Sequence, residues 1–204
     1  YRFLEKAGIN HPKYFLPKNV DELKEAVYKL GYPDKDVIIK PNIARGGRGF
    51  RVITKKADEF QIMFNKKHRG SFASLDEVLT LLNDKQFPDI VVGEYLSGDD
   101  YSVDILAKNG ETLIIVPKLR IVADLGYSTV GMIKRNKSVE DVAKEIIKAF
   151  RFDYSINIQI KLTEEGKAVP YEVNPRIAGT VVLATAGGVD LVYNAIKLAL
   201  GIAI

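Results

Sequence analysis

Apolar residues recur along the chain at two different spacings, and these spacings predict both helices and strands. Spacings of three and four positions are typical of a helix with one buried face. They occur over five segments: residues 21–30, 58–68, 75–83, 138–150 and 191–200. Short runs rich in β-branched residues at 37–41, 50–53 and 89–96 instead predict strands.

Turn residues predict two hairpins in the second half of the chain. Asn109-Gly110 is the strongest short turn signal, and a second polar turn lies at 164–166. The four hairpin strands are expected over residues 101–107, 112–116, 155–162 and 168–173. The segment 117–135 is mixed, and we expect two strands and a loop there.

Polar and glycine residues mark the expected helix ends. Asp21 is expected to cap the first helix, and Ser138 with Asp141 forms a candidate capping box. The segment from Phe3 to Gly8 is typical of the end of a helix that stops at a glycine. We therefore expect further sequence upstream of the first residue.

The order of these elements predicts an α+β fold. Strands follow one another in adjacent antiparallel pairs, whereas a parallel α/β fold would show regular βαβ units. The simplest division places a small lobe at about residues 20–97, within an N-terminal part of residues 1–97, and assigns the rest of the chain to a larger lobe. Residues 98–204 belong to that larger lobe.

Composition narrows the classes of function. The 204 residues are 47% hydrophobic, which is enough for a packed core. Lys and Arg number 30 against 26 acidic residues, and this small, dispersed excess does not predict a nucleic-acid partner. The absence of cysteine excludes disulfide frameworks and cysteine-based zinc sites, and it fits a cytoplasmic protein. Asp190, Asn194 and Lys197 interrupt the apolar C-terminal tract, so no membrane partner is expected.

A lysine and a glycine-rich loop follow the first predicted strand. Lys40 lies at the end of the strand, and Arg45, Gly46, Gly47 and Gly49 belong to the loop. Such a loop lets backbone N–H groups approach phosphate oxygens, although taken alone the pattern is more often a plain hairpin turn. It lacks the third glycine of a Rossmann fingerprint and the Gly-Lys-Ser/Thr of a P-loop.

Polar side chains close an otherwise apolar strand near the C-terminus. Glu172 and Asn174 alternate, so they share one face, and the hairpin places Gln159 opposite one of them. Carboxylate and amide oxygens are ligands that Mg²⁺ prefers. Pro175 ends the strand, which leaves Arg176 at its end to meet a phosphate or a carboxylate. A merely solvated strand explains this arrangement less well.

An acidic segment joins the two expected lobes. Glu94 ends a strand and is suited to accept hydrogen bonds from a ribose or an adenine amine. The backbone of Tyr95 and Leu96 is suited to contact an adenine edge, and Asp100 begins the next strand. For a generic protein, a solvated acidic linker is the simpler explanation.

The glycine-rich loop, the acidic segment and the late polar strand follow one another along the chain in an order that resembles the ATP-grasp family. The resemblance is greatest to the carbamoyl-phosphate-synthetase-type branch of that family. The resemblance extends over essentially the whole chain, and its most specific part is the Glu-x-Asn-Pro-Arg segment. The residues that carry it are Ile39-Lys40-Pro41, Gly46-Gly47-Arg48-Gly49, Gly93-Glu94-Tyr95-Leu96-Ser97-Gly98, Asn157-Ile158-Gln159 and Glu172-Val173-Asn174-Pro175-Arg176.

The resemblance implies an ATP-grasp fold of two lobes, each with a mainly antiparallel sheet and helices, and ATP between them. Lys40 would contact the phosphates, and the 45–49 loop would close over the β- and γ-phosphates. Glu94 would hold the ribose or adenine, with Tyr95 and Leu96 lining the purine pocket.

By the same resemblance, Gln159 and Glu172 would bind one Mg²⁺, and Glu172 with Asn174 a second, with Mn²⁺ as a substitute. Arg176 would stabilise the transferring phosphoryl group. Two cations that bridge the phosphates fit the charge requirements of phosphoryl transfer.

The implied activity is that of an ATP-dependent carboxylate–amine or carboxylate–thiol ligase that forms an acyl phosphate. The partners would be ATP, a small carboxylate, an amine or thiol acceptor, and an upstream pre-ATP-grasp domain of the same chain. One alternative is a regulatory nucleotide-binding module without turnover, and another is a non-enzymatic interaction domain.

The sequence departs from the family pattern at two places. Asp100 stands where family members often carry Glu, and residues 117–131 lack the histidine of the carbamoyl-phosphate enzymes. Lys118 and Arg120 occur there instead. Two interpretations stay open: Arg120, with Lys118, contacts the acceptor carboxylate or the γ-phosphate, or both belong to a solvated cationic strand.

Overall fold

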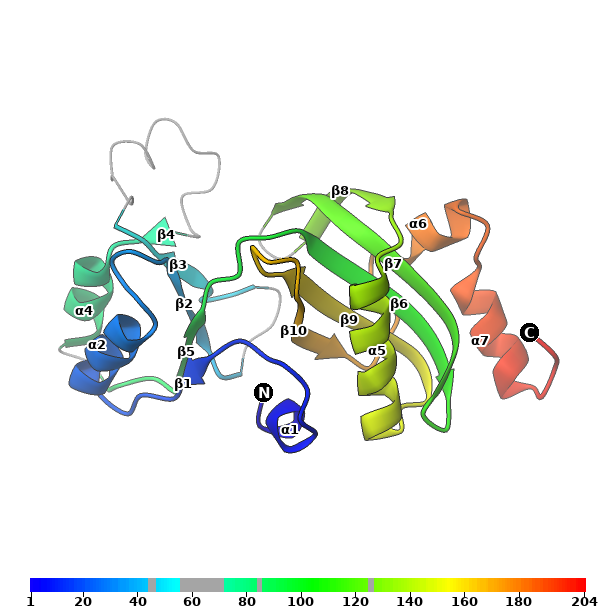
Figure 1. Ribbon diagram of the computed structural model, residues 1–204, viewed down its shortest axis with the longest axis horizontal. Helices are drawn as coiled ribbons and strands as arrows, with labels where there is room; N and C mark the ends of the chain where they lie inside the picture. Colours follow the sequence, from blue (N-terminus) through cyan, green and yellow to red (C-terminus); the bar gives the residue numbers. More distant parts are fainter. Residues whose placement is uncertain (44–46, 56–71, 84–85, 125–126) are drawn as a thin grey trace. The chain divides into compact units, whose positions relative to one another are not determined.

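The computed structural model describes five stretches of the chain: residues 1–43, 47–55, 72–83, 86–124 and 127–204. Arg45, Gly46 and the predicted helix over 58–68 lie outside the described residues. The predicted fold class is confirmed, because two mainly antiparallel sheets combine with helices in an α+β arrangement (Figure 1).

The chain divides into two compact units, which we describe separately. The large unit contains Tyr1–His11, Leu96–Ala123 and Ser128–Ile204, and the small unit contains Pro12–Tyr95 and Asp124–Tyr127. The two units share the N-terminal part expected over residues 1–97. Leu4 and Ile9 are buried in the core of the large unit, so the first eleven residues pack with the second half of the chain.

The small unit is built on a five-stranded sheet with the order β1-β5-β2-β3-β4. Its strands are β1 (Tyr14–Phe15), β2 (Val37–Pro41), β3 (Arg51–Ile53), β4 (Phe72–Ala73) and β5 (Ile90–Glu94). Its helices are α2 (Val20–Lys29) and α4 (Leu75–Asn83). The pairs β1·β5, β5·β2 and β2·β3 are antiparallel, and β3·β4 is parallel. Apolar residues of both helices pack with the sheet in one core.

The large unit is built on a second five-stranded sheet, with the order β10-β9-β6-β7-β8. Its strands are β6 (Asp100–Lys108), β7 (Glu111–Asp124), β8 (Tyr127–Ile133), β9 (Tyr154–Leu162) and β10 (Ala168–Asn174). Its helices are α1 (Arg2–Lys6), α5 (Lys137–Phe150), α6 (Val181–Ala186) and α7 (Leu191–Ala199). Both predicted hairpins are confirmed, and Asn109 and Gly110 have the positive φ angles that their turn requires, +52° and +82°.

Two expected helix caps are wrong. The helix predicted from Asp21 starts at Val20, and Asn19 caps it by accepting a hydrogen bond from the backbone N–H of Glu22. The capping box predicted at Ser138 is replaced in the same way by Asn136, which accepts from Val139. In both cases the capping residue is extended and lies just outside the helix, where its side chain reaches an unpaired N–H.

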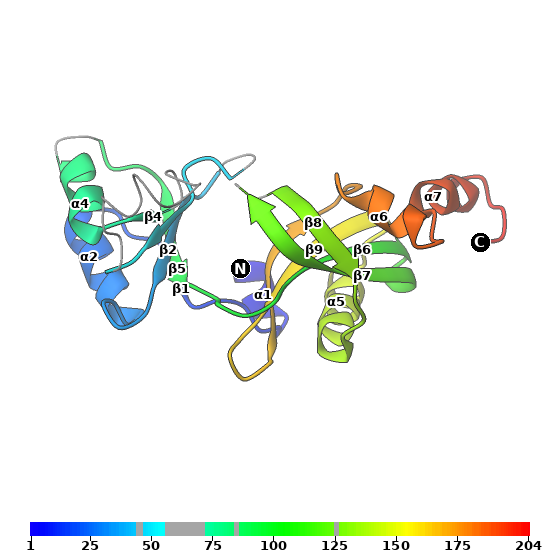
Figure 2. The ribbon, with the colours of Figure 1, turned by 90° about the horizontal axis from the view of Figure 1, so that it is seen from above.

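The two faces of the large-unit sheet differ in chemistry, and this difference positions the candidate site. One face is apolar and is covered by α5, as Figures 1 and 2 show. The other face, here called the polar face, carries Asp100, Ser102, Asp104, Lys118, Arg120, Asn157, Gln159, Lys161, Glu172 and Asn174. The helices α6 and α7 cover only one end of it, where they pack on Leu106 and Val116.

Candidate active site

The predicted metal ligands come together on β9 and β10. Glu172 lies directly opposite Gln159, and Asn174 lies opposite Asn157. Residues directly opposite each other in an antiparallel pair point to the same face. The amide Nδ2 of Asn174 donates to Oε1 of Glu172 at 2.9 Å, so these two side chains meet. The sequence left the partner of Gln159 open between Glu172 and Asn174, and the register assigns it to Glu172.

A β-bulge at Tyr171 turns these ligands to the polar face. Ala168 pairs with Leu162 and Pro170 with Ile160, and both pairs lie on the α5 side of the sheet. Strict alternation would place Glu172 on that apolar side as well. The register shifts between Pro170 and Glu172, so the extra residue moves the carboxylate to the opposite face.

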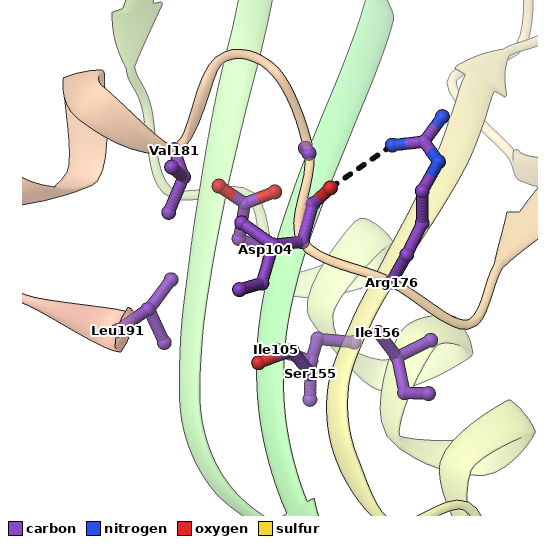
Figure 3. A pocket seen from close by; sticks show the side chains of 9 residues that line it. Asp104, Ile105, Ser155, Ile156, Arg176, Val181 and Leu191 are labelled. Carbon is purple, nitrogen blue, oxygen red and sulfur yellow. Dashed lines mark hydrogen bonds between the residues drawn. The ribbon is translucent and has the colours of Figure 1, made fainter. Parts of the chain in front are cut away.

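Arg176 lies just beyond the end of β10, as the sequence predicted. Its Nη1 donates to the backbone carbonyl of Ile177 at 3.1 Å, the contact drawn in Figure 3, and its Nη2 lies 3.4 Å from Oδ1 of Asn174. The guanidinium is therefore held next to the Glu172–Asn174 pair. A cation in this place is suited to bind phosphate oxygens beside a metal ion.

Arg120 lies in a second cluster on the polar face. Its Nη1 donates to Oδ2 of Asp100 at 2.9 Å and to the Tyr171 hydroxyl at 2.8 Å, and it lies 3.5 Å from Oε1 of Gln159. Tyr171 in turn donates to Oδ1 of Asp100 at 2.9 Å. The Arg120 side chain is only 6% exposed and that of Asp100 17%. The interpretation of Arg120 as part of a solvated strand is therefore wrong.

Burial raises the pKa of the Asp100 carboxyl above its ordinary value of 3.8. The cations Arg120 and Lys161 and the hydrogen bond from Tyr171 oppose this shift, while Glu172 adds to it. Because the folded-state pKa is above the unfolded-state pKa, the folded protein binds more protons between those two values. The contribution of Asp100 to the free energy of unfolding is thus greatest at low pH, and it falls as pH rises through the folded-state pKa.

The variant Asp100→Asn tests whether the stability contribution of Asp100 falls with rising pH. We expect the free energy of unfolding of the native protein, relative to the variant, to fall as pH rises from about 3.8. The difference should become constant above the folded-state pKa of Asp100. Urea denaturation at a series of pH values measures this difference. A difference that rises with pH would show that Arg120 and Lys161 outweigh the cost of burying the carboxylate.

Lys118 lies in a third, fully buried cluster. Its ammonium pairs with Oδ2 of Asp104, and it also donates to Oγ1 of Thr180 at 2.8 Å and to the carbonyl of Thr180 at 3.2 Å. The other oxygen of Asp104 accepts from Nδ2 of Asn157 at 2.8 Å, and Ser102 Oγ accepts from the same amide at 2.9 Å. The side chains of Lys118 and Asp104 are 2% and 5% exposed, so the solvated-strand interpretation is wrong for Lys118 as well.

Sequence reasoning did not assign roles to Ser102, Asp104 and Tyr171. Asp100, Ser102 and Asp104 alternate with apolar residues at a period of two, which is the pattern of one polar face on a half-buried strand. That pattern shows that they share a face, and the β6–β9 register places Gln159 on the same face. The part played by Tyr171 depends on the bulge, which has no such signal.

In the small unit, Gly49 of the glycine-rich loop lies beside Pro41 at the end of β2. Lys40 is half-buried on β2, opposite Val91. Gly47 and Gly49 have positive φ angles, +69° and +75°. A Cβ on Gly49 would lie 2.6 Å from Cγ of Pro41, so the loop approaches the strand more closely than any other residue type allows. The roles of Lys40 and these glycines in phosphate binding stay predictions.

The segment that was expected to contact adenine is held by specific hydrogen bonds. In the small unit, Glu94 ends β5, and its Oε2 accepts from the backbone N–H of Lys13 at 2.9 Å. In the large unit, the carbonyl of Leu96 accepts from Nζ of Lys161 at 2.9 Å. Contacts of Glu94, Tyr95 and Leu96 with a nucleotide stay predictions, as does the assignment of Asp100 to the nucleotide.

The donor set fits a magnesium ion. Gln159, Glu172 and Asn174 offer one carboxylate and two amide oxygens on one face, and the remaining coordination positions of Mg²⁺ are usually filled by phosphate oxygens and water. Within the described stretches, no three His, Cys, Asp or Glu side chains form a group that could hold a metal ion. No helix among the described residues has the length and apolarity to cross a membrane.

Comparison with known protein families and sequences finds one matching family and several relatives of this chain. Residues 86–203 match the family described as ATP-grasp in the biosynthetic pathway with Ter operon. The chain is 25% identical over 218 residues to the arginine-specific carbamoyl phosphate synthase large chain of Bacillus subtilis, covering 98% of this chain and 18% of that protein. It is 24% identical over 201 residues to the formate-dependent phosphoribosylglycinamide formyltransferase of Bacteroides thetaiotaomicron, covering 92% and 46%.

Solved structures show the same fold at low sequence identity. The biotin carboxylase domain of Hydrogenobacter thermophilus 2-oxoglutarate carboxylase, in complex with MgADP, ADP and bicarbonate, matches with a TM-score of 0.72 and 17% identity, covering 100% of this chain and 44% of that chain. Biotin carboxylase from Campylobacter jejuni, in complex with β-γ-ATP, matches with a TM-score of 0.71 and 17% identity, covering 100% and 45%. The chain thus spans less than half the length of each of these relatives.

Proposed function

This chain belongs to the ATP-grasp family, and we propose that it is the MgATP-binding domain of an ATP-dependent ligase. The single observation that supports this proposal most is the meeting of Gln159, Glu172, Asn174 and Arg176 at the end of one strand pair. Three oxygen donors for a hard cation and one guanidinium for phosphate oxygens are the components that phosphoryl transfer requires.

In this proposal, Gln159, Glu172 and Asn174 would hold two Mg²⁺ ions. When bound, these cations neutralise the negative charge of the phosphate groups and orient them. Arg176 contacts the γ-phosphate and stabilises charge on the transferring group. The Glu172–Asn174 hydrogen bond keeps both side chains in position for this role.

In the small unit, the proposed contribution is to nucleotide binding. Lys40 and the backbone of Gly47 and Gly49 contact phosphate oxygens, and Glu94 with Tyr95 contacts the nucleoside. The conformation of the loop supports the first part, because Gly49, with its positive φ angle, lies against Pro41, the residue after Lys40.

The proposed substrate is a small carboxylate, whose oxygen attacks the γ-phosphorus of ATP, so that ADP leaves and an acyl phosphate forms. An amine or thiol then attacks the acyl carbon, and inorganic phosphate leaves. The names of the relatives support a small acid, because one enzyme depends on formate and one solved structure contains bicarbonate. The nucleophile comes from the second substrate, which is why a Ser, Cys or His nucleophile on this chain is not required. We also propose that an upstream domain of the same chain helps to bind the acid.

Titration calorimetry with ATP tests this proposal. We expect ATP to bind in the presence of Mg²⁺ and to bind at least about tenfold more weakly when EDTA removes the metal, because unscreened phosphates repel the ligand carboxylate. ADP release in a panel of carboxylic acids and amines then identifies the substrates. If neither ATP nor ADP binds to the protein at millimolar concentration with Mg²⁺ present, the proposal is wrong.

A further inference from the structure

The segment that carries Arg176 crosses the polar face between β10 and α6. It comprises residues 175–180, here called the arginine segment. Figure 3 shows it arching past Asp104, with Arg176 on one side and Val181 on the other. Among the described residues, its backbone–backbone hydrogen bonds are short-range, such as the bond from the Val181 N–H to the Ala178 carbonyl at 3.1 Å. Its position on the sheet therefore depends on side chains from neighbouring strands.

Lys118 supplies the charged contact between the sheet and this segment. It projects from β7, and its ammonium donates to both oxygens of Thr180, the last residue of the segment. Thr180 is also the residue before α6, but its hydroxyl makes no capping bond to that helix. The hydroxyl instead accepts from Lys118, so its role is to fix the segment to the sheet.

Asp104 keeps the ammonium of Lys118 in place. An isolated charge at 2% exposure would be unstable, and the carboxylate both neutralises and orients it. Asn157 donates to the second oxygen of Asp104, so the carboxylate is itself oriented. The cavity next to this pair is lined by Asp104, Arg176 and Val181, among others, which places the ion pair directly beneath the arginine segment.

We propose that Lys118, held by Asp104, is a positioning residue for Arg176. Its contacts with Thr180 fix one end of the arginine segment, and the end of β10 at Asn174 fixes the other. The guanidinium then stays beside Glu172 and Asn174. This inference rests on the proposed function of Arg176 as a γ-phosphate ligand. It replaces the earlier interpretation that Lys118 itself contacts the acceptor carboxylate or the γ-phosphate.

The test uses the full chain and the variant Lys118→Met/Asp104→Leu. This double change removes both charges together and keeps similar side-chain volumes, so no buried charge is left unpaired. The control is Arg135→Met/Glu140→Leu, which removes an ion pair whose carboxylate is buried on α5, across the sheet from the polar face. Thr180→Val is a milder variant that removes one acceptor of Lys118 and keeps the ion pair.

Hydrogen exchange measures the position of the segment without any nucleotide. In the double variant, we expect faster exchange of the amides of Val181 and Leu183, which bond to Ala178 and Thr180. Thr180→Val should show a smaller increase at the same two amides. The control pair should leave both unchanged. Unchanged exchange in Lys118→Met/Asp104→Leu would overturn the inference.

Nucleotide affinity measures the consequence for Arg176. The readout is the preference for Mg·AMP-PNP over Mg·ADP, which isolates contacts with the γ-phosphate. We expect Lys118→Met/Asp104→Leu to keep its Mg·ADP affinity within about threefold. Its preference for Mg·AMP-PNP over Mg·ADP should fall about tenfold, which corresponds to the loss of one charge-assisted hydrogen bond. Arg176→Ala should lose the same amount, and the triple variant no more.

The outcomes separate the two proposals. A wild-type protein that binds neither nucleotide contradicts the proposed function, and hydrogen exchange alone then decides whether Lys118 positions the segment. A wild-type protein that prefers Mg·AMP-PNP, with that preference intact in the folded double variant, contradicts only the positioning role. Additive losses in the triple variant would also contradict it, because they would show that Lys118 and Arg176 act independently.

Discussion

Glu172→Gln is expected to lower ATP turnover by about a thousandfold or more. The glutamine keeps the size of the side chain and accepts the hydrogen bond from Asn174 through its amide oxygen. It removes the only carboxylate of the proposed metal set. A metal ligand of this kind contributes several kcal/mol of charge stabilisation, and each 1.36 kcal/mol corresponds to a factor of ten in rate.

The measurement is ADP release with the acid and amine that give turnover in the wild-type protein. Glu164→Gln is a matched control, because Glu164 is an exposed carboxylate in the turn that joins β9 to β10. We expect the control to keep turnover within about twofold, as surface substitutions usually have small effects. A Glu172→Gln protein with wild-type turnover and unchanged Mg²⁺ dependence would contradict the proposed metal site.

Lys118→Met is expected to lower the free energy of unfolding by about 3–5 kcal/mol. Removing one partner of a buried ion pair leaves the other charge without compensation, and this is among the largest effects of single substitutions. Burial already lowers the pKa of Lys118, against the attraction of Asp104, which shows how strongly this site disfavours charge.

The second change Asp104→Leu should restore most of that stability, because it removes the orphaned carboxylate. Asn157 then still donates to Ser102 and to the carbonyl of Val103. Urea denaturation of the two single variants and the double variant measures the coupling between them. If the double variant is as unstable as the sum of the two single variants, the ion pair is not a coupled unit.

The strands that carry the site were predicted better from the sequence than the helix caps and the short helix around them. The strands that carry Gln159 and Glu172 follow from turn residues and alternating apolar positions, which are local signals. The observed caps lie two residues before the expected ones at Asp21 and Ser138, because capping depends on where the helix actually begins. The short helix α6 was not predicted, since its six residues are too few for a periodic pattern.

The burial of Lys118 and Arg120 had no reliable signal in the sequence. Charged residues are usually exposed, and a strand with two cations two positions apart is typical of a solvated face. Each cation is stabilised in the buried site by an acid of β6: Arg120 pairs with Asp100, and Lys118 pairs with Asp104, two residues along β6 from its direct partner Ser102. These pairs depend on the β6–β7 register of a long hairpin. The acid that belongs to each cation can therefore be identified only once that register is known.

The bulge at Tyr171 matters for any attempt to move this site into a designed protein. Before the bulge, the even-numbered residues of β10 face the core, and after it they face the polar side. A Glu-x-Asn-Pro-Arg motif copied onto a regular hairpin at the equivalent position would point its ligands into the hydrophobic interior. The portable unit is therefore the motif together with its bulge and the facing strand β9, since only the three together aim Glu172 at the solvent-accessible side.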